Sequence, residues 1–114
     1  MHKIKINGSL YESIQDYCDQ NNIKKENFNE PVKIMENIED CDYMFLDCIS
    51  FNQPITIPDS VTSCKGMFAN CRSFNQPVTI PNGVENCRGM FEYCRSFNRS
   101  EEHTSELQSR IRIS

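Results

Sequence analysis

A segment that recurs every 23 residues constrains the fold of this chain more than any other feature. Residues 28–50, 51–73 and 74–96 align without gaps, and the second and third copies agree at 15 of 23 positions. A fourth copy opens at Phe97. In repeat proteins of this period, one unit cannot bury its apolar face alone and must pack against its neighbours. We therefore expect a stack of units in place of a domain with a single central core.

The repeat divides the 114 residues into three parts. Residues 1–27 do not fit it and are expected to form an N-terminal cap, since terminal units of such arrays are atypical. Residues 28–98 hold three full units and the start of a fourth. The motif then stops, and residues 99–109 resemble a translated sequencing adapter. We interpret 99–114 as an artefactual tail and leave it out of reasoning about fold and function.

The first half of each unit carries a strand pattern. In residues 54–58, two isoleucines flank Thr56 between two prolines, an alternation that favours a short half-buried strand. The positions expected to face inward are Val32, Ile55, Val78, Ile34, Ile57 and Ile80. The positions expected to face outward are Lys33, Thr56 and Thr79.

The second half of each unit carries a helical pattern. Residues 64–71 place apolar side chains at i, i+3, i+4 and i+7, which predicts a short helix or 3₁₀ turn with Gly66 as its weak point. The expected fold class is an α/β repeat. It is a short leucine-rich-repeat-type solenoid with one short strand and one short helical turn per unit, and with an N-terminal helical cap.

Phenylalanine and cysteine occupy fixed columns of the repeat, and these columns are the predicted core. The Phe columns are Phe28, Phe51 and Phe74, and Phe45, Phe68 and Phe91. The Cys columns are Cys41, Cys64 and Cys87, and Cys48, Cys71 and Cys94.

The state of the cysteines is open at this point. Zinc sites favour cysteines two to four residues apart, whereas the spacing within a unit is Cys-x6-Cys. Neighbouring units lie close enough for a disulfide within one column. Because the columns fall on the apolar stripe, we favour buried free thiols that act as small hydrophobic side chains. The seventh cysteine, Cys18, is expected to pack in the cap.

The N-terminal 27 residues predict a brief strand at Ile4 and Ile6 and a turn at Asn7-Gly8. Ser9 and Glu12 form a capping-box pattern, which predicts a helix over residues 10–20. The alternative is a helix-turn-helix fragment that continues through residues 23–25 and binds nucleic acid. Two lysines in an acidic chain give this alternative little support.

Composition and charge exclude several functional classes. The net charge of −4 and the pI near 5.1 argue against a dedicated nucleic-acid or anionic-membrane binder, and no apolar run is long enough to cross a membrane. The first residues lack the apolar region of a secretory signal. A cysteine nucleophile would need a nearby base, and His2 is the only candidate histidine outside the tail. We expect no enzyme activity and no cofactor.

The consensus FNQPxxIPxxVxxCxxMFxxCxS resembles the BspA-like leucine-rich repeats of bacterial and protist surface proteins. The stretch CKGMFANCRSFNQP is similar to the repeat of mycoplasmal lipoprotein-associated domains. The resemblance covers residues 28–98 and implies an adhesion or protein-interaction scaffold without catalytic residues. Such proteins are usually found at the cell surface.

These observations predict a non-catalytic scaffold that binds a protein or a surface glycan through the outward face of its strands. We expect neither a nucleic-acid partner nor a membrane span. The alternatives are the helix-turn-helix module fused to repeats and a cysteine-based metal or redox protein. The chain is expected to be a fragment of a longer array. The predicted binding residues are Lys33, Thr56, Thr79, Gln53 and Gln76.

Overall fold

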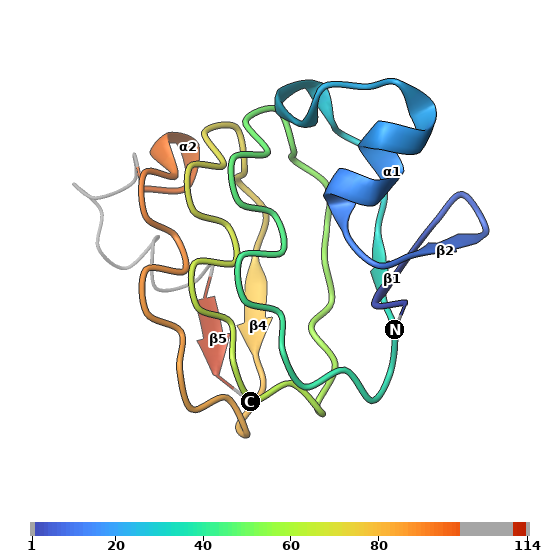
Figure 1. The fold of residues 1–114 in the computed structure, drawn as a ribbon. Coiled ribbons are helices and arrows are strands. Elements are labelled where there is room, and N and C mark those ends of the chain that lie inside the picture. The colour runs from blue at the N-terminus through green and yellow to red at the C-terminus, as the bar shows by residue number, and fades with distance from the viewer. Residues whose placement is uncertain (1, 99–110, 114) are drawn as a thin grey trace.

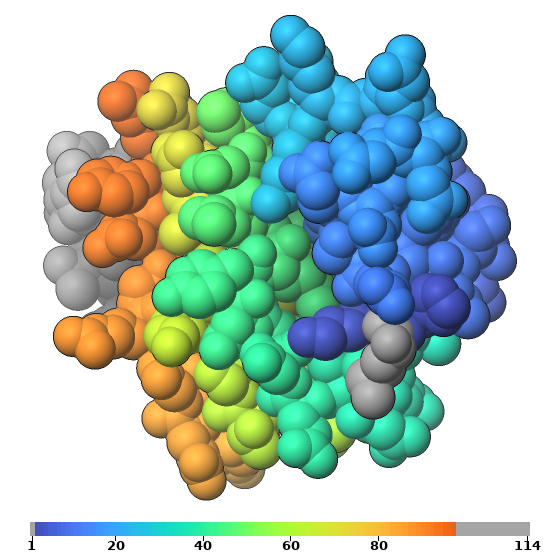
Figure 2. All heavy atoms as spheres, in the orientation of Figure 1, coloured from blue at the N-terminus to red at the C-terminus, as the bar shows by residue number. Residues whose placement is uncertain are grey.

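The computed structural model describes residues 2–98 and 111–113. The chain winds through successive turns that lie side by side, beginning at the N-terminal region and continuing through the three 23-residue units (Figure 1). In the space-filling view the units form adjacent bands, from the blue N-terminal residues through green and yellow to orange (Figure 2). Residues that lie 23 positions apart in the sequence are therefore next to each other in space.

The N-terminal region is a hairpin followed by a helix. Strands β1 (Ile4–Ile6) and β2 (Ser9–Tyr11) pair antiparallel, with Ile6 opposite Ser9. Asn7 and Gly8 both have positive φ, 51° and 85°, which suits a two-residue hairpin turn. The predicted helix over residues 10–20 is wrong at its start, because Ser9–Tyr11 folds back on β1 as a strand.

The helix α1 (Ile14–Asn21) begins four residues later than predicted. Its N-cap is Ser13, whose hydroxyl accepts a hydrogen bond from the Asp16 N–H at 3.1 Å, so the capping box predicted at Ser9 does not form. The helix ends at Asn22, which is left-handed with φ 56°. A 3₁₀-helix, η1 (Lys25–Asn27), then leads into the first unit.

The second half of each unit is a chain of β-turns, in place of the predicted short helix or 3₁₀ turn. The N–H groups of Met67, Ala69 and Cys71 each donate to the carbonyl three residues earlier, at 3.0–3.2 Å. Gly66 and Asn70 have φ of 57° and 61°, a left-handed conformation that interrupts any helix. Successive β-turns also bring the apolar residues at i, i+3, i+4 and i+7 into the core, so the pattern does not require a helix.

The intervening N–H groups point to the neighbouring unit. Gly66, Phe68 and Asn70 donate to carbonyls of the third unit, at 2.9, 2.9 and 2.7 Å. The first unit makes the equivalent bonds to the second: Tyr43, Phe45 and Asp47 donate to Lys65, Met67 and Ala69, at 2.8, 2.8 and 3.0 Å. A ladder of backbone hydrogen bonds thus joins all three units along their turn-rich half.

The strand half is paired at its two ends. Strand β3 (Lys33–Ile34) pairs antiparallel with β1, and β4 (Val78–Ile80) pairs parallel with β5 (Ile111–Ile113), which lies in the segment interpreted above as an artefactual tail. The equivalent segment of the second unit, residues 54–58, is extended but has no strand assignment. The expectation of one strand per unit therefore holds for the first and third units alone among the described residues.

Phenylalanine rings form the centre of the core. The rings of Phe45 and Phe68 stack at 5.3 Å, with an interplanar angle of 2°. Rings that open successive units stack at 5.9–6.0 Å, ending with Phe97 in the helix α2 (Arg95–Asn98). The two columns also touch each other, for example Phe68 and Phe74 at 4.3 Å. Each ring gains apolar burial and offset stacking from the next unit, so the core is continuous along the stack.

Candidate binding face

The outward positions of the strand half form one exposed row. Lys33, Thr56 and Thr79 occupy the same position in successive units, and all three side chains are exposed. The six inward positions beside them are at most 8% exposed. The alternation of apolar and polar residues between Val32 and Ile80 thus separates a buried side from a solvent-facing side.

Gln53 and Gln76 were predicted to add polar contacts to this row, and the structure gives them a different role. The Gln53 amide donates to the carbonyl and the side-chain oxygen of Asn29, at 3.3 and 3.2 Å. Gln76 repeats both contacts with Asn52, at 3.1 Å each. The two amides join consecutive units, which corrects their assignment to the free binding surface.

The same asparagines bond to the backbone of the next unit. The Asn29 side-chain oxygen accepts from the Asn52 N–H, and the Asn52 oxygen accepts from the Asn75 N–H, both at 2.8 Å. This ladder of asparagines was missed by the sequence reasoning. Its signal was present, because every unit has Asn directly after its opening Phe.

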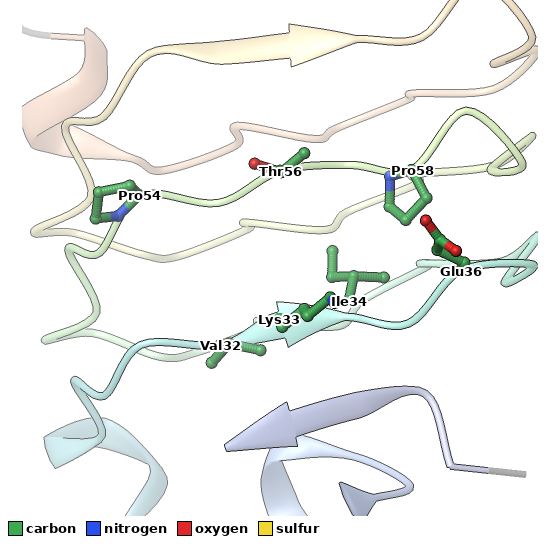
Figure 3. Close-up of a pocket in the computed structure, with 7 residues that line it drawn as sticks. All are labelled: Val32, Lys33, Ile34, Glu36, Pro54, Thr56 and Pro58. Atoms are coloured by element: carbon green, nitrogen blue, oxygen red, sulfur yellow. The ribbon is translucent and has the colours of Figure 1, made fainter. Parts of the chain in front are cut away.

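A groove of about 480 Å³ lies between the strand segments of the first and second units (Figure 3). Lys33 and Thr56 line it from opposite sides, whereas Thr79 does not. An adjoining hollow of about 380 Å³ shares Glu36, Thr56 and Pro58 with the groove and extends it past Asp59. The full lining of the groove is Val32, Lys33, Ile34, Glu36, Pro54, Thr56 and Pro58.

The groove exists because the strand segments of the first two units are not joined by backbone hydrogen bonds. Among the described residues, no backbone hydrogen bond connects residues 32–36 with residues 54–58. The Phe rings nearest the turn ladder stack at 5.3–5.6 Å, and those that lead into the strand half stack at 5.9–6.0 Å. Pro54 and Pro58 have no N–H to donate. The units therefore open slightly toward the strand half.

Charge is distributed unevenly along the groove. Lys33 lies in the middle of one wall, between Val32 and Ile34, and Glu36 lies beside Pro58 at the far end (Figure 3). Asp59 adds a second carboxylate at that end. Within the described part of the chain, no hydrogen bond engages the side chains of Lys33 or Glu36. Both charges are available to a ligand.

The cysteines are free thiols, and six of the seven are buried. Removal from water raises the pKa of Cys41 and Cys48 to about 12 and that of Cys64 and Cys94 to about 11. The pKa of Cys71 is raised for the same reason. A thiol with a raised pKa stays protonated near neutral pH and is a poor nucleophile and a poor metal ligand.

Two thiols also bond across the units. Cys71 Sγ donates to the Phe45 carbonyl at 2.9 Å, and Cys94 Sγ donates to the Phe68 carbonyl at 2.7 Å. The partner lies 26 residues earlier in each case. This column therefore requires a side chain that is small and apolar and that can also donate one hydrogen bond.

Two residues of the predicted core are not fully buried. Cys87 is exposed, and Phe91 is only partly buried. Both belong to the third unit, on the side where no further unit is stacked within residues 2–98 and 111–113. Their counterparts in the second unit, Cys64 and Phe68, are fully buried because the third unit covers them. The other predicted core residues are buried.

Among the described residues, no feature supports the two alternatives raised by the sequence, a metal or redox protein and a helix-turn-helix module. Within residues 2–98 and 111–113, no group of three or more His, Cys, Asp or Glu side chains is arranged to hold a metal ion. The segment after α1 contains the three-residue η1, where a helix-turn-helix requires a second full helix. No helix in the described ranges is long and apolar enough to cross a membrane. The suspected adapter segment, residues 99–109, lies outside the described residues.

The sequence matches the family described as Mycoplasma protein of unknown function, DUF285, over residues 17–109. No curated protein matches the chain, and no solved structure does. The matched span includes all three units and the second half of α1.

Proposed function

The chain belongs to the family described as Mycoplasma protein of unknown function, DUF285, and from this premise we propose that it is a non-catalytic binding scaffold. Its ligand is a protein or a surface glycan, held by the exposed row of the strand half. The observation that carries this proposal is the groove of about 480 Å³ beside Lys33 and Thr56. Its volume lies within the range usual for ligand sites.

The proposal includes the architecture. We assign the stack to the leucine-rich-repeat-type solenoids, of the BspA-like kind, with turns in place of the helical segment. Bonds between residues 23 apart support this assignment, for example Asn52 to Asn29 and Asn75 to Asn52. Stacked repeats of this kind present an extended surface for binding.

We propose a non-catalytic role because the candidate nucleophiles, the cysteine thiols, are poorly suited to catalysis. The buried thiols have raised pKa values, and the exposed Cys87 lies in the third unit, away from the groove between the first two. A cysteine enzyme would need a thiolate paired with a base at an accessible site.

A selection experiment tests the proposal. A library of displayed proteins and peptides is panned on the chain, and each binder is then measured on two variants. Thr56→Lys places a bulky cation in the groove, and Thr62→Lys places the same change at an exposed position outside it. We expect binders that lose affinity with Thr56→Lys and keep it with Thr62→Lys. Binders indifferent to both changes would place the binding surface elsewhere.

A further inference from the structure

A second hollow lies on the turn-rich half of the stack and shares no residue with the groove of the strand half. Its volume is about 440 Å³, within the range usual for ligand sites. All three units contribute to its lining. The small side chain of Ala69 lines it from the second unit, whereas the same repeat position carries Leu46 in the first unit and Glu92 in the third.

Hydrogen bonds fix a row of polar groups in this hollow. The Asn70 amide donates to the Asp47 carboxylate at 3.0 Å, and Arg72 Nε donates to the Asn70 side-chain oxygen at 3.2 Å. One Asp47 oxygen and the terminal N–H groups of Arg72 have no hydrogen-bond partner in the described part of the chain. Acceptors and donors thus lie side by side in a row that is already ordered, so binding a ligand costs little side-chain entropy.

Tyr93 lines the same hollow with a ring that is 71% exposed. Its φ is 62°, and its repeat equivalents Asp47 and Asn70 have φ of 64° and 61°. Aspartate and asparagine tolerate this left-handed conformation, whereas a bulky residue is disfavoured in it. Among residues 2–98 and 111–113, no ring contact or side-chain hydrogen bond engages Tyr93. A strained and exposed aromatic residue that adds little to the core indicates a ligand site.

The charges around the hollow indicate the chemistry of the ligand. Arg72 and Arg95 are balanced by Asp47 and Glu92, and no ion pair joins these groups within the described residues. A ligand of one charge sign would be attracted by one pair and repelled by the other. A hydroxyl both donates and accepts, so neighbouring hydroxyls can bond guanidinium and carboxylate groups together. The apolar C–H face of a sugar ring can also pack on an aromatic ring.

We propose that this hollow binds a neutral oligosaccharide, with one sugar ring packed on Tyr93. Asp47, Asn70 and Arg72 bond the hydroxyls of that sugar. An adjoining hollow of about 560 Å³ shares Asp47 and Asn70 and continues to Lys25, so the site has room for further sugar units. The site is additional to the groove of the proposed function.

A printed array of neutral and acidic glycans tests the site. The full chain is biotinylated and tetramerised on streptavidin, so that weak contacts add. Tyr93→Ala removes the ring from the hollow. Tyr43→Ala is the matched control, because Tyr43 is 49% exposed with φ of 58° and does not line the hollow. We expect a neutral glycan whose affinity falls about tenfold with Tyr93→Ala and is kept with Tyr43→Ala.

A second variant fills the hollow. Ala69→Leu installs the residue that the first unit carries as Leu46, so the repeat accommodates it, and it should abolish the same signal. The inference is overturned if no glycan signal depends on Tyr93 and Ala69. A glycan lost with Thr56→Lys and kept with Tyr93→Ala would support the proposed function and overturn the inference. Tyr93-dependent binding of acidic glycans alone, or of a capped triglutamate peptide, would show an anion site and would also overturn it.

Discussion

At the scale of single residues, the contact between Tyr43 and Gly66 shows how tightly one turn fits the next. A Cβ built on Gly66 would lie 2.5 Å from Tyr43 Cε1, closer than such atoms approach. Gly66 also has φ of 57°, where any other residue is strained. Gly89 holds the equivalent position in the third unit with φ of 65°, but a Cβ there would meet nothing within 4 Å.

This pair gives a matched prediction on stability. Gly89→Ala should lower the free energy of unfolding by about 1 kcal/mol, from backbone strain alone. Gly66→Ala should cost about 2 kcal/mol, because the Tyr43 ring must also leave its place. Urea denaturation measures both values, and Tyr43→Ala should remove the excess in a double variant. Equal costs at the two glycines would contradict the packing of Tyr43 across the units.

The asparagine ladder gives a second prediction at this scale. Asn52→Ala removes the acceptor of the Asn75 N–H and of the Gln76 amide, and it should cost about 1 kcal/mol because the site is partly solvated. Asn82→Ala changes an exposed asparagine that makes no such contact among the described residues and should cost less. Thermal unfolding of the two variants compares them. A larger loss for Asn82→Ala would mean that the ladder does not stabilise the stack.

At the scale of elements, the cysteine columns behave as part of the core. In the folded chain a thiol reagent should modify Cys87 quickly and the six buried cysteines only on unfolding. The expected count is one reactive thiol per folded molecule. Cys87→Ser is the control and should abolish the fast phase. Rapid labelling of a second cysteine in the native state would show that the columns are accessible.

The same burial gives the stability a defined pH dependence. The pKa of Cys41 rises from its usual value near 9.0 to about 12 on folding, and that of Cys64 rises to about 11. Because the unfolded chain loses these protons first, the thiol contribution to stability should be constant below about pH 9 and should fall as the pH rises toward 11 and 12. Each such thiol contributes a slope of up to about 1.4 kcal/mol per pH unit. Denaturation curves across this range that show no decline would contradict the burial.

The sequence predicts the elements to different degrees. The inward and outward positions of the strand half were predictable, because alternation around Thr56 depends on local geometry alone. The helical pattern of residues 64–71 was misleading, since β-turns with left-handed Gly66 and Asn70 also gather its apolar residues. Asn70 is the informative residue, because asparagine tolerates positive φ where most residues do not. The helix start at Ile14 was missed because Ser9 and Ser13 both offer a cap.

The groove could not have been predicted from the repeat. Its existence depends on the spacing between units, and spacing follows from which half carries the hydrogen-bond ladder. Equivalent residues such as Thr56 and Thr79 look alike in sequence, yet only Thr56 lines the groove. The role of Gln53 could not be predicted either, because a free amide and a hydrogen-bonded amide give the same sequence pattern.

At the scale of the whole molecule, backbone hydrogen bonds join the units along the turn-rich half, whereas the strand segments of the first two units are tied only near their ends, for example by Asn52 to Asn29 and Ser60 to Ile38. The turn half carries backbone bonds between all three units, and residues 32–36 have no backbone bond to residues 54–58. The proposed binding surface depends on this asymmetry. A stack bonded equally along both halves would have no groove between residues 32–36 and 54–58.

Hydrogen exchange of single backbone amides, followed by NMR, tests this asymmetry most directly. The amides of Gly66, Phe68 and Asn70 donate to the third unit and should exchange slowly, near the rate set by global unfolding. The amides of Thr56 and Ile57, which have no backbone acceptor among the described residues, should exchange orders of magnitude faster. Equally slow exchange at Thr56 and Phe68 would mean that the strand half is hydrogen-bonded and closed. That result would contradict the groove and the binding proposed there.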